Sequence, residues 1–156
     1  MIRSILLAAT ATTAAGLLFV NIYNSVVDAP NWGANLPHSI ETARAYFAAA
    51  NPGTFYRIAS PLNQVLAFIA LILSWRNNRY VAVSLLLSAI LADILTFGYF
   101  YPRNDVMFVN PVNESAVRIA WEQWSTMNWV RTALCLVNTT LAFILLIFNS
   151  RNTFAK

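Results

Sequence analysis

The sequence predicts an all-α fold, namely an integral membrane antiparallel four-helix bundle with a helical outer extension. The first observation behind this prediction is composition: of 156 residues, 58% are hydrophobic and 10% are charged, with a mean hydropathy of +0.56. A soluble domain carries roughly 25% charged residues. The second observation is that the chain contains four long runs with at most one charged residue each. So few charges cannot cover a soluble globule of this length, and much of the surface must therefore face lipid.

Each run is long enough, or nearly so, for a membrane-spanning helix, which takes about 20 apolar residues. Arg3 followed by an apolar stretch also resembles a secretory signal, but this stretch is longer than the apolar region of such signals, so we predict a span. Short connections favour one antiparallel bundle, so residues 1–156 are predicted to form a single domain. The predicted spans are residues 4–27, 58–75, 80–102 and 129–148.

Two longer segments, residues 28–57 and 103–128, connect the spans on the outer side. In the first, Ile40, Ala43 and Phe47 recur at helical spacing, which predicts a short amphipathic helix ending before the breaker at residues 51–53. In the second, a helical stripe runs from Glu114 directly into the fourth span. The fourth helix is therefore predicted to begin near residue 114 and to reach about 52 Å at 1.5 Å per residue.

The distribution of basic residues predicts the orientation. Four spans place both termini on one side of the membrane, together with the connection 76–79. Lysine and arginine number five on each side, but on the side of the termini they lie in very short segments without acids, so we predict cytoplasmic termini in a multi-pass plasma (inner) membrane protein. The bases beside the termini are Arg3, Arg76, Arg79, Arg151 and Lys156; those on the opposite side are Arg44, Arg57, Arg103, Arg118 and Arg131.

Several classes of function are excluded by the residues that the chain contains. Its ten basic residues form no run, so no stripe is available to follow the phosphates of a nucleic acid. Cys135 is the single cysteine and His38 the single histidine, which excludes an intramolecular disulfide and bis-histidine or cysteine-rich metal sites. We therefore predict no tightly bound haem, copper or zinc and no metal site.

Polar residues within the predicted spans mark a shared interior face in the outer half of the bundle. Asn21 and Asn24 are three residues apart, and Asn128, Arg131, Cys135 and Asn138 follow i, i+3, i+7 and i+10, with Trp124 one turn further out. Asp93 lies nine residues before Pro102, about 13 Å from the outer end of its span. Because lipid cannot solvate these groups, they must face the bundle interior, which predicts a polar pocket that opens outward.

These residues have two competing interpretations. Asn21, Asn24, Asn63 and Asn138 can serve only as hydrogen bonds between helices, or they can line a ligand pathway. Asp93 and Arg131 are predicted to form an ion pair, because they carry opposite charges in the same half of neighbouring helices. The aromatic residues favour a belt at the membrane interface, with Trp124 as the exception because it continues the polar stripe.

The second half of the chain resembles the four-span membrane family that contains the anthrone oxygenases. The resemblance is carried by Tyr101-Pro102-Arg103-Asn104-Asp105 after the third span and by residues 124–131, which fit a W-x-x-x-N-x-x-R pattern at the start of the fourth. Anthrone oxygenases oxidise a phenolic anthrone to the quinone with dioxygen, without metal or flavin. The resemblance implies that the protein removes a proton, stabilises the resulting anion and admits oxygen.

On this resemblance, Asp93 is the candidate base, and Arg131 with Asn128 or Asn104 would stabilise the oxyanion. An ion pair with Arg131 would make Asp93 a poorer base, so its two predicted roles compete. Trp124, Tyr99 and Trp32 could stack on a flat ring system. The predicted site therefore has catalytic residues Asp93, Arg131 and Asn128, and substrate-binding residues Trp124, Asn104, Asn21, Asn24, Tyr99, Trp32 and Asn138.

Three functional hypotheses follow from these patterns. The first is a cofactor-independent oxidoreductase, an anthrone-oxygenase-like monooxygenase that acts on a hydrophobic aromatic or quinone-like molecule. The second is a non-catalytic membrane protein that holds a lipid or a partner subunit. A small transporter is disfavoured because the sequence shows neither inverted repeats nor broken spans. Small residues in the first span predict a face for a homo-oligomer: Ala8, Ala11, Ala15 and Gly16.

Overall fold

The computed structural model describes residues 1–154, with side chains for residues 1–150, and this described part consists of helices and their connections. Two of the basic residues that predict the orientation, Arg151 and Lys156, have side chains outside the described part. The elements, with η for π-helical segments, are α1 (Ile2–Tyr23), η1 (Asn24–Asp28), α2 (Ala29–Gly33), α3 (His38–Tyr46), α4 (Pro52–Leu95), η2 (Thr96–Phe100), α5 (Tyr101–Asn104), η3 (Asp105–Val109) and α6 (Glu114–Phe154).

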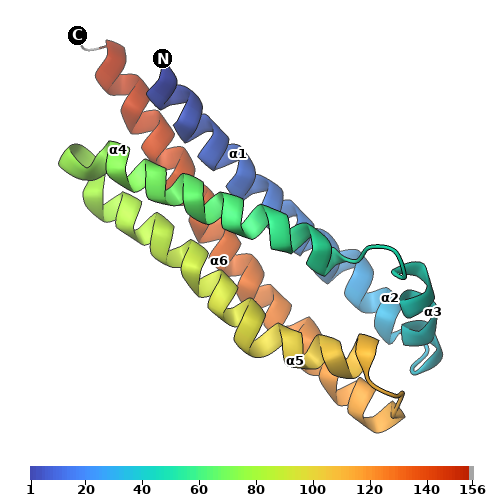
Figure 1. Ribbon diagram of the computed structural model, residues 1–156. Helices are drawn as coiled ribbons and strands as arrows, with labels where there is room; N and C mark the ends of the chain where they lie inside the picture. Colours follow the sequence, from blue (N-terminus) through green and yellow to red (C-terminus); the bar gives the residue numbers. More distant parts are fainter. Residues whose placement is uncertain (155–156) are drawn as a thin grey trace.

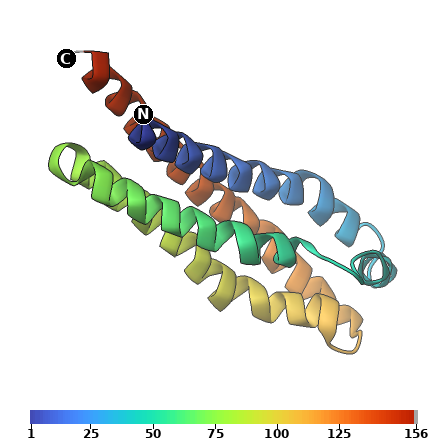
Figure 2. The ribbon, with the colours of Figure 1, turned by 45° about the horizontal axis from the view of Figure 1, so that its top comes forward.

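The predicted four-helix bundle is confirmed. Helix α4 reverses at Asn78, whose φ of −137° and ψ of 38° leave the helical region, so α4 consists of a first limb, residues 52–77, and a second limb, residues 79–95. These limbs lie antiparallel, and α1 and α6 complete the bundle (Figures 1 and 2). Both termini lie at the same end as the reversal (Figure 1). We call this the inner end, and the end that carries α2, α3 and α5 the outer end.

The helices have the length and composition of membrane spans. Three continuous helical stretches, Ile2–Gly33, Pro52–Val109 and Glu114–Ser150, are long and apolar enough to cross a membrane, and the second contributes two limbs. Large apolar side chains cover the outside of the bundle, among them Phe19, Ile58, Phe68, Ile72 and Ile94. Exposed apolar side chains in such numbers are stable in contact with lipid. The chain is therefore a membrane protein.

Small residues form the core near the inner end. Alanines from all four helices pack there with a few leucines, which brings the helix axes close together. Ala11 belongs to this core and is 1% exposed, so it faces the bundle and is not on an outer face with Gly16. The buried members of this core are Leu7, Ala11, Ala14, Ala67, Ala70, Ala82, Leu85, Ala142 and Leu145.

The helices extend further outward than the predicted spans. The short helix predicted before residues 51–53 is confirmed as α3, which ends at Tyr46. The second span, predicted from residue 58, begins earlier, because Asn51 caps α4: its Oδ1 accepts a hydrogen bond from Thr54 N at 3.1 Å, and Pro52 occupies the first turn. The segment after Pro102, predicted to be a loop, continues as helix through α5 and η3 to Val109. Helix α6 begins at Glu114, where the sequence pattern places the start of the fourth helix.

A second core at the outer end joins the short helix α3 to the bundle. Ile40 and Ala43 of α3 are buried beside Trp32, Met107 and Trp124. Arg44 Nε donates to the carbonyl oxygen of Met107 at 2.8 Å, and its Nη2 donates to that of Asn110 at 2.9 Å. These bonds satisfy carbonyl groups at the C-terminal end of η3 and hold α3 across the outer end.

Candidate functional site

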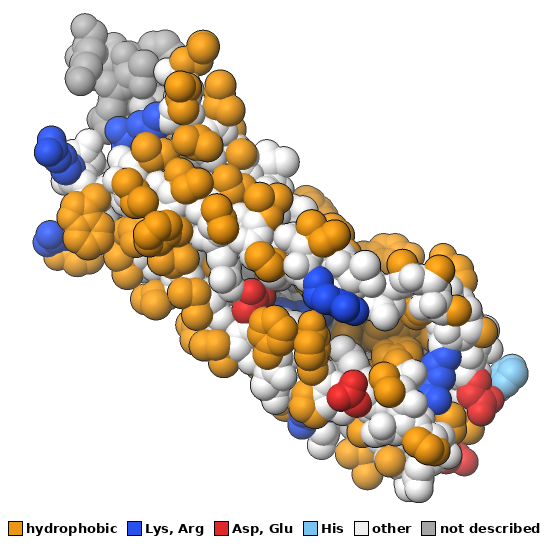
Figure 3. Space-filling model, in the orientation of Figure 1, with side chains coloured by type: hydrophobic (Ala, Val, Ile, Leu, Met, Phe, Trp, Pro, Cys, Tyr) orange, Lys and Arg blue, Asp and Glu red, His pale blue; other side chains and the backbone are white. Residues whose placement is uncertain are grey.

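A cavity of about 430 Å³ lies in the outer half of the bundle. Its wall is formed by η1 and α2, by Arg44 of α3, by the chain from Phe47 to Arg57, by η2 to η3, and by α6. Figure 3 shows a hollow near the middle of this face, edged by acidic and basic side chains. The residues that line it include Asn24, Trp32, Arg44, Phe47, Tyr56, Arg57, Thr96, Tyr101, Asn104, Asp105, Phe108, Trp124 and Arg131.

Aromatic rings form much of the cavity wall. The Trp32 ring contacts the Trp124 ring at a centroid distance of 5.0 Å and the Phe108 ring at 5.1 Å, both edge to face. Tyr56 and Tyr101 line the same space. Such edge-to-face pairs hold the rings in defined positions. Contrary to a purely interfacial role, Trp32 and Trp124 are 6% and 3% exposed and belong to the interior of the protein.

Arg131 lies at the inner end of this cavity and is 4% exposed. Its guanidinium carbon is 4.1 Å from the Phe100 ring centroid, 4.8 Å from that of Tyr56 and 5.9 Å from that of Trp124. The faces of aromatic rings attract a cation because of their quadrupole. The predicted ion pair with Asp93 is wrong: among the described side chains, the two ion pairs join Arg118 to Glu114 and His38 to Glu41. The buried guanidinium is compensated by rings rather than by a carboxylate.

Asn128 holds Arg131 in place. Arg131 Nη2 donates to Asn128 Oδ1 at 2.6 Å, and Asn128 Nδ2 donates to Ser25 Oγ at 2.7 Å and to the carbonyl oxygen of Asn21 at 3.2 Å. Ser25 lies within the π-helical segment η1, and such segments are frequent at functional sites. The Asn128 side chain is 0% exposed and does not line the cavity, so it holds Arg131 in position without contacting the cavity itself.

Three buried N–H donors of the cavity-lining residues carry no hydrogen bond. They are Nδ2 of Asn24, Nε1 of Trp124 and Nε of Arg131. Buried polar groups are almost always hydrogen-bonded, and an unpaired one costs about 1–3 kcal/mol. Arg131 lines the cavity, and its positive charge favours a ligand with a negatively charged acceptor oxygen.

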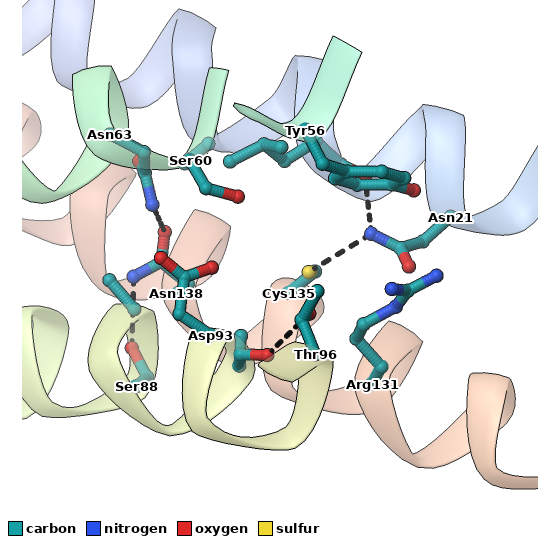
Figure 4. A pocket seen from close by; sticks show the side chains of 14 residues that line it. Asn21, Tyr56, Ser60, Asn63, Ser88, Asp93, Thr96, Arg131, Cys135 and Asn138 are labelled. Carbon is teal, nitrogen blue, oxygen red and sulfur yellow. Dashed lines mark hydrogen bonds between the residues drawn. The ribbon is translucent and has the colours of Figure 1, made fainter. Parts of the chain in front are cut away.

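A second, much smaller pocket of about 20 Å³ adjoins the cavity on its inner side. Tyr56, Thr96 and Arg131 line both spaces and form the partition between them. Figure 4 shows Arg131 and Tyr56 on one side of the small pocket, Asp93 and Ser60 on the other, and Cys135 between them. Its remaining lining residues that carry polar groups are Asn21, Asn63, Ser88 and Asn138.

Asp93 faces the small pocket and not the large cavity. It is half-buried and accepts a hydrogen bond from Gln64 Nε2 at 2.5 Å, across the two limbs of α4. The sequence places Asp93 and Arg131 in the same half of the bundle, and the structure adds that Asp93 lines the small pocket and not the large cavity, whereas Arg131 lines both.

Two of the predicted asparagines form hydrogen bonds between helices. Asn63 Nδ2 donates to Asn138 Oδ1 at 3.1 Å, and Asn138 Nδ2 donates to Ser88 Oγ at 2.9 Å and to the carbonyl oxygen of Leu85 at 2.8 Å. This network joins both limbs of α4 to α6. Asn21 Nδ2 donates to the carbonyl oxygen of Leu17 at 2.8 Å and to Cys135 Sγ at 3.3 Å. Asn63, Asn138 and Asn21 therefore serve packing on the small-pocket side, whereas Asn24 lines the cavity.

The remaining predicted residues divide between cavity and surface. Asn104 lines the cavity together with Trp32, Trp124 and Arg131, as the sequence interpretation requires. Tyr99 does not: its ring lies under the guanidinium of Arg103 at 3.4 Å, and its hydroxyl donates to the carbonyl oxygen of Gln123 at 3.4 Å. One residue of η2 thus turns toward α6 and away from the predicted ligand.

Sequence reasoning missed Tyr56 and Thr96, which form the partition with Arg131. Tyr56 falls in the predicted connection 28–57 because the uncharged run that predicts the second span begins only after Arg57. The N-cap signature of Asn51 followed by Pro52 could have placed it in the first turn and a half of a helix.

No protein-family model matches the chain, and comparisons with curated proteins and with solved structures also find no match. Within the described residues, no three His, Cys, Asp or Glu side chains lie together in a way that could hold a metal ion.

Proposed function

We propose that the protein is a membrane-embedded, cofactor-independent oxidoreductase, a monooxygenase similar to the anthrone oxygenases, that acts on a hydrophobic aromatic or quinone-like molecule. The observation that carries this proposal is the buried guanidinium of Arg131, a cationic set of hydrogen-bond donors at the inner end of a cavity lined by aromatic rings. A flat phenolic ring system fits the aromatic wall, and its oxygen would accept hydrogen bonds from these donors. The motif resemblance at residues 101–105 and 124–131 supports the same chemistry.

The reaction requires an electron-rich substrate and dioxygen. Removal of a proton from the ring methylene of an anthrone gives an anion whose charge lies largely on the carbonyl oxygen. This anion transfers electrons to dioxygen and forms a carbon–oxygen bond at the former methylene; loss of water then gives the quinone. One oxygen atom of O₂ enters the product, and the other leaves as water with the two methylene hydrogens. The substrate is oxidised and dioxygen is reduced, so no further reductant is needed.

In this proposal Arg131 stabilises the oxyanion, and Asn24 and Trp124 donate further hydrogen bonds. Asn128 is a positioning residue because it contacts Arg131 and not the cavity. Asp93 is the proposed proton acceptor, reached across the partition of Tyr56, Thr96 and Arg131. Asp105 lines the cavity directly and is therefore the competing carboxylate.

We also propose the plasma (inner) membrane with cytoplasmic termini as location. Arg3, Arg76 and Arg79 lie at the inner end, close to the ends of the helices, where basic residues favour the cytoplasmic side. The cavity would then lie in the outer half of the membrane and receive its ligand from the outer leaflet.

Oxygen consumption by the purified protein with anthrone as substrate tests the proposed reaction. Wild-type protein is expected to consume one O₂ per quinone formed. We expect Arg131→Gln to lower kcat about 100-fold or more, the effect of removing an oxyanion donor, and Asp93→Asn to lower kcat by a similar factor for a general base. Asp105→Asn is the matched carboxylate control. Loss of turnover in Asp105→Asn with full turnover in Asp93→Asn would move the base to Asp105, and no turnover above buffer in the wild type would refute the reaction.

A second function, non-catalytic binding of a lipid or another anionic amphiphile, is favoured by one observation: Asp93 does not line the large cavity. A protein that only binds an anionic amphiphile needs Arg131 and the aromatic wall but no base. In that case ligand binding would depend on Arg131 and be unaffected by replacement of either carboxylate, and no quinone would form.

A further inference from the structure

We infer that the ligand of this cavity carries a second acidic group, a carboxylate on its ring system, which Arg57 recognises at the rim. This inference deepens the proposed function, because it concerns the same cavity and names a subclass of its ligands. It depends on four charged side chains that line the cavity, Arg44, Arg57, Arg131 and Asp105.

The four charged residues have different surroundings. Arg44 is engaged by the carbonyl oxygens of Met107 and Asn110 and is not available to a ligand. Arg131 is buried at the inner end. Arg57 and Asp105 are exposed, and neither is joined by an ion pair or a side-chain hydrogen bond within the described part of the chain. Arg57 is therefore a free cation at the rim of the cavity.

The balance of charge in the cavity favours an anion with two acidic sites. The three arginines and one aspartate that line the cavity have a net charge of +2, and neither Arg131 nor Arg57 forms an ion pair with a carboxylate of the described residues. A rigid aromatic ligand whose oxygen is held at Arg131 would extend along the wall of Trp32, Trp124 and Tyr56 toward the rim. A carboxylate at that end meets the guanidinium of Arg57, which presents a fork of donors suited to carboxylate oxygens.

Arg57 also lies close to the start of a long helix. The cavity wall includes Asn51, Pro52 and Gly53, the cap and first residues of α4. The N-terminal end of a helix carries partial positive charge, which adds to the attraction of Arg57 for an anion at the rim.

A pair of probes that differ only in this charge tests the inference: anthraquinone carboxylate and its methyl ester. Binding is measured in neutral detergent by quenching of tryptophan fluorescence, since Trp32 and Trp124 line the cavity. We expect the carboxylate to bind wild-type protein about fivefold more tightly than the ester, the scale of a partly exposed ion pair. This preference is expected to fall as the salt concentration rises.

Arg57→Gln is expected to remove the preference for the carboxylate and leave the Kd of the ester unchanged. Arg57→Lys is expected to retain part of the preference, and Arg76→Gln, an exposed arginine on the same helix at the inner end, is the matched control with no effect. Equal binding of the two probes by the wild type, or an equal loss of both in Arg57→Gln, would overturn the inference. Failure of both probes to bind wild-type protein would instead overturn the proposed function.

Arg57 could also hold the phosphate of a lipid headgroup, because a long side chain near the membrane interface reaches toward the headgroups. The same titration repeated with added phosphatidylglycerol distinguishes the two anions. The lipid is expected to leave the Kd of the carboxylate probe unchanged. Competition by the lipid in the wild type that is absent in Arg57→Gln would overturn the assignment of Arg57 to the ring carboxylate.

Discussion

Arg131 Nη2 donates a hydrogen bond to Asn128 Oδ1 at 2.6 Å, one turn earlier on α6, and this is its one hydrogen bond to a described side chain. Asn128 connects the guanidinium to α1, because its Nδ2 donates to Ser25 Oγ and to the carbonyl oxygen of Asn21. A buried cation is thus held by an amide that is itself fixed by the neighbouring helix. The energetic cost of burying the charge is lowered by the three aromatic rings around it.

Asn128→Ala is expected to lower the free energy of unfolding by about 2–3 kcal/mol, because Arg131 and Ser25 lose their partners inside the protein. Unfolding in detergent, followed by circular dichroism, measures this difference. Asn110→Ala, which truncates an exposed side chain, is the matched control. A loss in Asn128→Ala no greater than in the control would show that Asn128 does not hold Arg131.

Asn138→Leu is expected to destabilise the bundle by about 1–2 kcal/mol, because bonds between membrane helices contribute about 0.6 kcal/mol each on average. Asn63→Leu and the double variant complete a cycle, and the coupling energy between the two positions should be about 0.6 kcal/mol. Probe binding should stay at the wild-type Kd, since neither residue lines the large cavity. A selective loss of binding in Asn138→Leu would instead assign this asparagine to the ligand site.

Gly33→Ala is expected to lower the free energy of unfolding by about 1–3 kcal/mol, the cost of overpacking. A Cβ atom at Gly33 would collide with the ring of Trp121, whose Nε1 donates to the carbonyl oxygen of Ala29 at 2.7 Å. At Gly16 nothing lies within 4 Å of such an atom, so Gly16→Ala should stabilise α1 by up to about 1 kcal/mol. Thermal unfolding measures the change in Tm of each variant, which should be negative for Gly33→Ala and positive for Gly16→Ala. A change of the same sign in both variants would contradict the close packing of α2 on α6.

Arg44→Gln is expected to loosen α3 from η3, because the carbonyl oxygens of Met107 and Asn110 lose a charged donor. The free energy that holds α3 on η3 should fall by about 1.5–3 kcal/mol for each charged hydrogen bond that water does not replace. Limited proteolysis measures this loosening as a faster rate of cleavage within residues 47–51, the connection between α3 and α4. Arg118→Gln, which breaks only an exposed ion pair with Glu114, is the control and should be cleaved at the wild-type rate.

Much of the fold could be predicted because its signals are local. Uncharged runs of span length predicted four helices, and the spacing of Trp124, Asn128, Arg131, Cys135 and Asn138 predicted one buried stripe, all of whose members are buried. Helix ends were less predictable, because the same Asn-Pro-Gly sequence can break one helix or cap the next. Asn51 does the second, and this moves Tyr56 from a loop into the wall of the site.

The sequence by itself determined that the chain is an all-helical membrane protein and that the strongly polar residues of its predicted spans lie in their outer halves. Hydropathy and helical periodicity depend only on neighbours along the chain. Only the tertiary structure decided which of those side chains meet. The rotation of each helix about its axis and the π-helical segments in the outer half place Arg131 against Phe100, Tyr56 and Trp124. They leave Asp93 across a partition, bonded to Gln64. Asp93 and Arg131 lie in the same half of the bundle but form no ion pair, because aromatic rings stabilise the guanidinium and the Gln64 amide donates a hydrogen bond to the carboxylate.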